Sequence, residues 1–245
     1  MRALSIMYHD VVENGDFPSS GFPGEGAHVY KLRREDFELH LNAMGDRDVM
    51  LTFDDGGVSF LHPIADLLEA RGRRGYFFIT TDRIGTPGFL AADQVRELHR
   101  RGHFVGSHSA SHPTRMAALS RAELDREWRA SLKHLSELLG EPVKLASVPG
   151  GYYSREVGRS AAAAGIVKLF TSEPTARVTQ VDDCFIFGRY VVQRGMSPAW
   201  SAGFATGSPS YCWRQTLLWK AKRIAKSLGG SAYLRAREAI LEKKG

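Results

Sequence analysis

Two acidic side chains stand next to each other where an apolar stretch of the sequence ends. Asp54 and Asp55 follow residues 49–53, and Gly56 and Gly57 come directly after them. The apolar stretch predicts a buried strand, and the glycines predict that it turns into a loop. Neighbouring side chains of an extended chain point in different directions, and two close carboxylates repel each other. We therefore expect separate roles, with one carboxylate binding a cation and the other handling a proton. The alternative is a solvated Asp-Gly turn.

Two histidines four residues apart form a second chemical motif. His108 and His112 lie within residues 107–113, Ser-His-Ser-Ala-Ser-His-Pro. On a helical turn, side chains at this spacing share a face, so both imidazoles could bind one cation. Two histidines and one carboxylate are a common set of ligands for a divalent metal. Asp55 could supply the carboxylate. The alternative is a solvated loop, because serine and proline also fit one.

The remaining sequence alternates between strand-like and helix-like stretches about seven times. Strands are expected over residues 3–8, 49–53, 75–80, 103–107, 144–147, 166–171 and 184–192, and helices over 34–44, 60–71, 91–101, 120–139 and 155–164. This alternation is typical of parallel βαβ units. Polar residues close nearly every strand, which favours a barrel whose site gathers at the carboxyl ends of the strands. Neither a Gly-x-Gly-x-x-Gly motif nor a P-loop is present, which argues against a nucleotide-binding fold.

Composition narrows the class of protein further. The 245 residues suit one large domain, and 43% hydrophobic with 24% charged residues is ordinary for a globular protein. Cys184 and Cys212 match no zinc spacing and form no disulfide framework. No stretch approaches the ~20 apolar residues of a membrane span, and the N-terminus lacks a signal-peptide pattern. The sequence therefore predicts a cytoplasmic protein.

A long segment rich in glycine, proline and serine follows the first expected strand. It covers residues 13–28 and includes Pro18, Gly21, Pro23 and Gly24. Long loops inside compact domains are often lids or binding loops, so this one is expected to shape a pocket.

The motifs together resemble the polysaccharide deacetylases, the NodB-homology or carbohydrate esterase family 4 proteins. Residues 52–56, Thr-Phe-Asp-Asp-Gly, resemble the first motif of that family, and residues 108–112 resemble the second. Residues 102–107 and 147–151 are similar to the stretch before the second motif and to the third motif. The resemblance covers roughly residues 1–175.

The resemblance implies a fold, a reaction and a set of site residues. It implies a distorted (β/α) barrel, often seven-stranded, that hydrolyses N-acetyl groups on sugars. The family's metal ligands map onto Asp55, His108 and His112, with zinc as the first candidate, and its general base maps onto Asp54. A divalent metal lowers the pKa of bound water and polarises a carbonyl, and a carboxylate held off the metal can remove the water proton.

Residues 149–151, Pro-Gly-Gly, stand in the place of the family's third motif. A backbone N–H near Gly150, Gly151 and Tyr152 is expected to stabilise the oxyanion, because small residues let a backbone approach the substrate closely. The alternative is a plain turn.

Two departures from the family pattern leave roles open. The third motif usually carries an arginine that orients the base, and here Ser147 stands in that place, so that Arg189 or Arg194 is expected to substitute. The family usually ends with a Leu-x-His motif whose histidine protonates the leaving amine, but no histidine follows residue 134. His9, at the end of the first strand, is the leading candidate for that acid. Glu173 and His103 are weaker candidates, and a structural role for His9 remains open.

The C-terminal residues carry the whole positive excess of the chain, whose formal net charge is +6. Residues 213–245 hold two glutamates and nine basic residues, which gives nine minus two, or +7; the basic residues are Arg214, Lys220, Lys222, Arg223, Lys226, Arg235, Arg237, Lys243 and Lys244. We expect a barrel domain over residues 1–206 and a basic amphipathic helical extension over 207–245. Residues 212–245 either pack on the barrel or associate peripherally with the inner face of a membrane. No nucleic-acid-binding motif accompanies the basic residues.

The sequence therefore predicts a metal-dependent hydrolase that removes N-acetyl groups from an N-acetylated sugar, as a polysaccharide or a lipid-linked precursor, in exopolysaccharide or glycoconjugate synthesis. Two alternatives remain: an amidase acting on a small non-sugar amide, and a carbohydrate-binding relative without catalysis. Intact Asp54, Asp55, His108 and His112 argue against the second, because a binding module needs no metal site.

Overall fold

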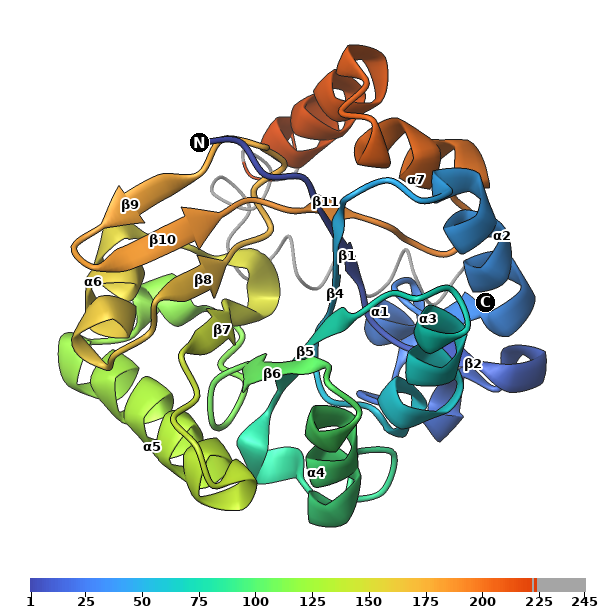
Figure 1. Cartoon of the computed structure of the whole chain (residues 1–245). Helices are drawn as coiled ribbons and strands as arrows, with labels where there is room; N and C mark the ends of the chain where they lie inside the picture. Colours follow the sequence, from blue (N-terminus) through green and yellow to red (C-terminus); the bar gives the residue numbers. More distant parts are fainter. Residues whose placement is uncertain (222, 224–245) are drawn as a thin grey trace.

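A curled and mostly parallel β-sheet lies at the centre of the molecule, with helices around its outside (Figure 1). The computed structural model describes residues 1–221 and residue 223. Within them, one sheet of nine strands has the order β11-β1-β4-β5-β6-β7-β8-β10-β9, and β2 and β3 form a second, two-stranded sheet. All pairs in the large sheet are parallel except β9 with β10. The edge strands β11 and β9 do not pair, so the barrel is open on one side.

The strands are short, between two and five residues each. Their bounds are β1 Ser5–Tyr8, β2 Val11–Val12, β3 Leu32–Arg33, β4 Met50–Phe53, β5 Gly75–Ile79, β6 Phe104–Ser107, β7 Leu145–Ser147, β8 Lys168–Phe170, β9 Thr179–Val181, β10 Cys184–Phe187 and β11 Tyr190–Val191. The helices are α1 Glu25–His28, α2 Arg34–Met44, α3 Asp66–Glu69, α4 Ala92–Arg100, α5 Arg121–Leu139, α6 Arg155–Ala163 and α7 Pro198–Ala205.

The predicted (β/α) barrel is confirmed, with more strands than the seven expected. The extra strands are short edge elements, which leave little periodicity in the sequence. The helix expected over residues 60–71 is only partly α-helical, because residues 61–65 form a π-helix and α3 covers Asp66–Glu69. Pro63 lacks an N–H for a helical hydrogen bond, which explains the interruption. The helices predicted over 34–44 and 120–139 match α2 and α5 within one residue.

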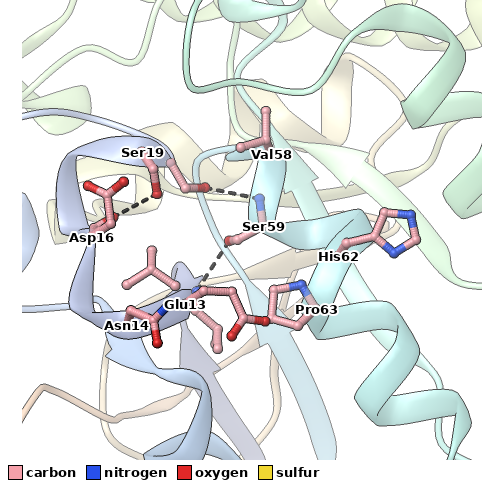
Figure 2. A pocket seen from close by; sticks show the side chains of 11 residues that line it. Glu13, Asn14, Asp16, Ser19, Val58, Ser59, His62 and Pro63 are labelled. Carbon is pink, nitrogen blue, oxygen red and sulfur yellow. Dashed lines mark hydrogen bonds between the residues drawn. The ribbon is translucent and has the colours of Figure 1, made fainter.

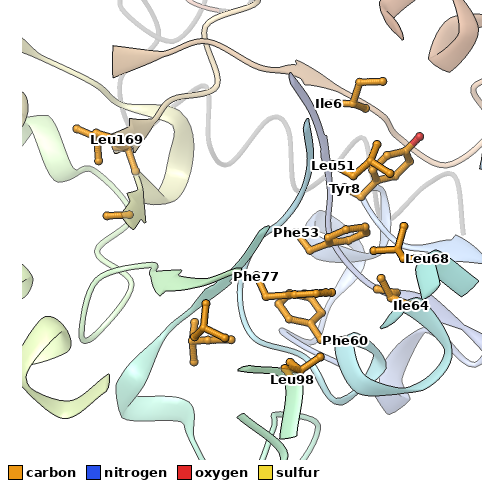
Figure 3. Packing of buried hydrophobic residues seen from close by; sticks show 14 of the residues in the cluster. Ile6, Tyr8, Leu51, Phe53, Phe60, Ile64, Leu68, Phe77, Leu98 and Leu169 are labelled. Atoms are coloured by element: carbon orange, nitrogen blue, oxygen red, sulfur yellow. The ribbon is translucent and has the colours of Figure 1, made fainter. Parts of the chain in front are cut away.

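The main hydrophobic core lies between the sheet and the surrounding helices. Phe53 of β4 stacks on Phe77 of β5 with ring centroids 5.0 Å apart, and Phe60 packs on Phe77 at 5.2 Å (Figure 3). All three side chains are fully buried. Burying a side chain of this size contributes ~1.5–3 kcal/mol, so this cluster fixes β4 and β5 beside each other. A smaller cluster of Phe78, Phe170 and Phe187 joins β5, β8 and β10.

The start of the predicted C-terminal extension docks on the barrel. Residues 209–221 are helical, and the Gln215 amide exchanges two hydrogen bonds with the backbone of Val191 in β11. The rest of the helical extension expected over 207–245 lies outside the described residues. The boundary between residues 206 and 207 stays a prediction.

Candidate metal centre and active site

The carboxyl ends of the parallel strands bring the predicted site residues to one rim. Asp54 directly follows β4, His108 follows β6, and His9 follows β1. Ser147 is the last residue of β7, which lies next to β6 in the sheet. Since β1 and β4 are also neighbours, the sheet order places these polar groups on adjacent strands.

Asp55, His108 and His112 form a compact set of metal-ligand atoms. Asp55 Oδ1 lies 3.4 Å from His108 Nε2 and 3.4 Å from His112 Nε2, and the three atoms all fall within 4.8 Å of one another. Zinc binds such atoms at 2.0–2.1 Å, so tetrahedral ligands stand about 3.4 Å apart. The side chains are 11%, 2% and 23% exposed, respectively, so His112 is the most open to solvent. The residues fit a small divalent cation.

The electrostatics of this set favour a cation. Burial by itself would raise the pKa of Asp55, but hydrogen bonds with His108 and His112 outweigh it and hold the pKa well below its usual range. Burial would lower the pKa of His112, and the Asp55 carboxylate instead raises it. The ionised carboxylate therefore faces two imidazole Nε2 atoms, which is the donor chemistry of a divalent metal site.

The loop that carries both histidines is not a helical turn, unlike the geometry considered from their spacing. Residues 108–112 contain no helix, and Ser109 and His112 have positive φ angles of 64° and 61°. Ser109 Oγ accepts a hydrogen bond from the His112 N–H at 3.0 Å. The side chains converge because the backbone bends back on itself.

Asp54 is held in place by an arginine fork. Arg189 Nη1 and Nη2 donate to Asp54 Oδ1 and Oδ2, both at 2.7 Å, and Arg189 Nε donates to Thr171 O at 2.9 Å. Burial would raise the pKa of Asp54, but the charges of Arg189 and His108 lower it below its usual value. Of the two arginines expected for this role, Arg189 lies at Asp54, whereas the Arg194 guanidinium lies over the Phe17 ring.

Ser147 connects Asp54 to His108, a contact that the sequence did not predict. His108 Nδ1 lies 2.5 Å from Ser147 Oγ, which in turn donates to Asp54 Oδ1 at 3.1 Å. A histidine that donates its Nδ1 proton presents Nε2 to the metal. Ser147 thus stands at the position where the resemblance leads us to expect an arginine, and its hydroxyl contacts both His108 and Asp54.

His9 lies near both carboxylates, and its imidazole has a free nitrogen. Its charge lowers the pKa of Asp54 and of Asp55. Its Nδ1 is buried and has no hydrogen-bond partner among the described residues. The ring packs on Tyr30 with centroids 4.8 Å apart. His103, a weaker candidate, is already engaged by Glu69 and the Gly75 N–H.

The residues predicted near the oxyanion form a tight turn that packs on Thr114, two residues after His112. Pro149–Gly151 is a 3₁₀ turn in which Gly150 has φ 67°. A Cβ at Gly150 would lie 2.4 Å from Thr114 O, and one at Gly151 would lie 2.6 Å from Ser172 Oγ. The glycines are therefore required by close packing and positive φ. Arg115 lies over the Tyr152 ring at 5.4 Å. The oxyanion role stays a prediction.

The segment of residues 17–31, here called the strap, borders the site on two sides. The Phe22 ring packs on His112 with centroids 4.6 Å apart, and Tyr30 packs on His9. The buried Lys31 ammonium donates to the carbonyls of Phe17, Ser20 and Phe22. The glycine and proline content of residues 13–28 predicts a functional loop, but neither Phe22 nor Lys31 could be singled out from it.

A pocket of about 260 Å³ lies beside this segment (Figure 2). Val11, Val12 and Val58 contribute apolar walls, whereas Glu13 and His62 contribute polar ones. None of Asp54, Asp55, His108 or His112 lines it. The pocket is therefore separate from the candidate active site.

Curated proteins with similar sequences include two fungal chitin deacetylases. The protein of Arthroderma benhamiae is 34% identical over 64 residues, and that of Colletotrichum lindemuthianum is 33% identical over 66 residues. Each match covers 26% of this chain, and the matches cover 17% and 27% of the two relatives. The chain thus spans only a small part of either relative's length.

Solved structures share the fold at low sequence identity. A polysaccharide deacetylase from Bacillus cereus has a TM-score of 0.70 at 17% identity, covering 84% of this chain and 69% of that one. IcaB from Ammonifex degensii has a TM-score of 0.66 at 19% identity, covering 83% and 97%. At sequence identities of 17% and 19%, the similarity of these structures shows only that the fold is shared.

A model of one protein family also matches the sequence itself. Its description is polysaccharide deacetylase, and it matches residues 42–169. The match begins before β4 and ends within β8, so it includes Asp54, Asp55, His108, His112 and Ser147. Because the match covers just over half of the 245 residues, this chain belongs to the polysaccharide deacetylase family.

Proposed function

We propose that this protein is a metal-dependent N-deacetylase that removes acetyl groups from an N-acetylated sugar, in a polysaccharide or a lipid-linked precursor. One observation carries the proposal. The Arg189 fork keeps the Asp54 carboxylate ionised beside Asp55, His108 and His112, whose donor atoms suit a divalent cation. Membership of the polysaccharide deacetylase family supports deacetylation as the reaction, and the similarity to chitin deacetylases supports an N-acetylated sugar as the substrate.

Asp54 is the proposed general base. A divalent ion held by Asp55, His108 and His112, with zinc as the first candidate, would supply an activated water and polarise the acetamide carbonyl. Asp54 Oδ1 accepts hydrogen bonds from Arg189 and Ser147, whereas Oδ2 accepts only one from the described residues, from Arg189. Oδ2 therefore keeps more of its accepting capacity, and we assign the water proton to it. Arg189 and Ser147 hold the carboxylate in place during the transfer.

The other two steps would use a backbone N–H and the His9 imidazole. A backbone N–H near Gly150, Gly151 and Tyr152 would donate to the carbonyl oxygen as negative charge develops there. The His9 imidazole would give a proton to the sugar nitrogen as the C–N bond breaks, which yields acetate and a free amine. The assignment of His9 as the acid is supported by its place directly after β1, next to β4, and by its charge, which helps to lower the pKa of both carboxylates.

An acetate-release assay tests the proposal. Zinc-loaded protein is incubated with N-acetylglucosamine oligomers, with other N-acetylhexosamine donors and with small non-sugar amides, and the free acetate is measured. We expect release from at least one sugar, and loss of ~10²-fold or more in Asp54→Asn, because general base catalysis contributes ~10²–10⁴-fold. Asp46→Asn, an exposed site, is the matched control and should keep full activity. Acetate only from the non-sugar amides would establish the amidase alternative instead.

Peripheral membrane association stays a prediction for residues 212–245. Trp213, Leu217 and Leu218 are 63%, 44% and 57% exposed on the helix over residues 209–221. Among the described residues, no helix has the length and apolarity needed to cross a membrane. Exposed tryptophan and leucine beside Arg214 and basic neighbours support binding to an anionic lipid surface. A cytoplasmic location is also still a prediction.

Liposome flotation tests this association. Full-length protein should float with vesicles that contain anionic lipid, and a variant with serine at positions 213, 217 and 218 should not. Leu39→Ser removes a leucine that is 54% exposed on α2 and serves as the control. Equal flotation of all three proteins would exclude the role of this helix.

A further inference from the structure

Helix α5 presents two buried polar residues to the loop that carries the metal-binding histidines. Glu127 and Ser131 are one helical turn apart and are 9% and 0% exposed. Neither residue belongs to a motif described above. Side chains four positions apart share a helix face, so both point toward the loop over residues 107–112.

Glu127 accepts three hydrogen bonds from two consecutive residues of that loop. Oε2 accepts from the Ala110 N–H at 3.0 Å and the Ser111 N–H at 2.9 Å, and Oε1 accepts from Ser111 Oγ at 2.7 Å. No arginine, lysine or histidine pairs with Glu127 within the described part of the chain. Its carboxylate therefore serves the loop alone.

Ser131 holds the start of the same loop through a chain of hydroxyl groups. Ser107 Oγ donates to Ser131 Oγ at 2.7 Å and accepts from the Ser109 N–H at 3.0 Å. Ser109 Oγ in turn accepts from the His112 N–H at 3.0 Å. The polar contacts thus run from α5 to the backbone of a metal ligand.

The loop needs such an external support because its backbone is strained. Ser109 and His112 adopt positive φ angles of 64° and 61°, which residues other than glycine rarely adopt. Such conformations cost ~1–3 kcal/mol each and persist only where surrounding contacts impose them. The N–H groups of Ala110 and Ser111, which belong to no strand or helix, also need acceptors. The Glu127 carboxylate satisfies both groups at once.

We propose that Glu127, supported by Ser131, is a positioning residue of the metal site, which fixes the loop so that His108 Nε2 and His112 Nε2 both face Asp55. The inference rests on the metal site of the proposed function, but not on the identity of the substrate. Groups that orient metal ligands typically change metal affinity by ~10–100-fold when they are removed. Glu127 should therefore control the affinity for zinc more than the stability of the fold.

Zinc titration of metal-free protein tests the proposal. The dissociation constant is measured by competition with a chromophoric chelator for the wild type, Glu127→Gln and Ser131→Ala. Glutamine keeps the size of Glu127 but turns one acceptor atom into a donor that would face the loop's donors. We expect zinc to bind ~10–100-fold more weakly in Glu127→Gln and several-fold more weakly in Ser131→Ala.

Glu137→Gln is the matched control, because its side chain lies on the same helix and is 67% exposed. Its dissociation constant should stay within about twofold of the wild type. Circular dichroism and the thermal midpoint of the metal-free proteins show whether each variant folds. A merely structural role for Glu127 would lower that midpoint and leave zinc affinity unchanged. If Glu127→Gln does not fold, Ser131→Ala decides the result.

The outcomes separate this inference from the proposed reaction. Zinc affinities within twofold of the wild type in both α5 variants would overturn the inference, as would a wild type that binds no zinc. A wild type that binds one zinc ion and releases no acetate from any sugar contradicts the proposed reaction. The role of Glu127 is still decided by the affinities in that case.

Discussion

Replacement of Arg189 by methionine should produce a large and pH-dependent loss of stability. The Arg189 side chain is 0% exposed and the Asp54 side chain is 4% exposed, with two hydrogen bonds of 2.7 Å between them. Removing one partner of a buried ion pair costs ~3–5 kcal/mol, because the other charge stays buried without compensation. At ~2–4 °C per kcal/mol for a chain of this size, the thermal midpoint should fall by roughly 6–20 °C.

The pH dependence follows from the pKa of Asp54. In the wild type this pKa lies below its ordinary value of 3.8, so Asp54 contributes stability above that value and loses it as the pH falls through the folded-state pKa. Without Arg189, burial raises the pKa above that of the unfolded chain. Asp54 would then take up a proton at a higher pH than in the wild type, which relieves the uncompensated buried charge. The variant's loss of stability should therefore be smaller at pH 5 than at pH 8.

Urea unfolding of metal-free protein at pH 5 and pH 8 measures both effects. Arg194→Met is the matched control, because the exposed Arg194 side chain lies over Phe17 and does not contact Asp54. It should cost less than ~1 kcal/mol at either pH. A loss below ~1 kcal/mol in Arg189→Met at pH 8, or an equal loss at both pH values, would refute the role assigned to the fork.

Three further predictions concern the surroundings of the site. Burial lowers the pKa of His40, so His40 takes up a proton at a higher pH in the unfolded chain than in the folded protein. The free energy of unfolding should therefore fall as the pH drops through the ordinary value of 6.5. An unchanged free energy in urea unfolding between pH 7 and pH 5 would exclude this effect. Gly150→Ala places a Cβ 2.4 Å from Thr114 O, whereas in the control Gly85→Ala the Cβ meets no atom within 4 Å at a similarly positive φ. The first variant should lose ~1–3 kcal/mol more free energy of unfolding than the second. Equal losses would show that the turn at Gly150 accommodates the methyl group without cost. Lys31→Met removes three hydrogen bonds within the strap, so limited proteolysis within residues 17–31 should be faster than in the wild type. An unchanged cleavage rate would show that other contacts hold the strap in place.

The strand-end motifs could be predicted because each is local in the sequence. An apolar strand followed by Asp54-Asp55, and the pair His108 and His112, each show their chemistry within seven residues. Parallel strands bring their carboxyl ends to one rim, so the convergence of these groups follows from the alternation of strands and helices. The structure brings Asp55 and the two histidines within 4.8 Å of one another.

The partners of these residues could not be chosen from local patterns. Arg189 is 135 positions from Asp54 in the sequence, and Arg194 stands only five residues further on. Which of them reaches Asp54 depends on the pairing of β10 with β8, a contact that no spacing in the sequence encodes. Glu127 was hidden for a similar reason, since it lies in an amphipathic helix where a glutamate is usually solvated.

The dependence of acetate release on bound metal tests the central claim most directly. Metal-free wild type, Asp55→Asn and His112→Ala are titrated with zinc, and the rate of acetate release from the best N-acetylated sugar is recorded at each ratio. We predict that wild-type activity rises linearly and levels off at one equivalent of zinc, whereas both variants stay inactive over that range. Full activity of the metal-free protein, or an unchanged titration in Asp55→Asn, would contradict the assignment of this site.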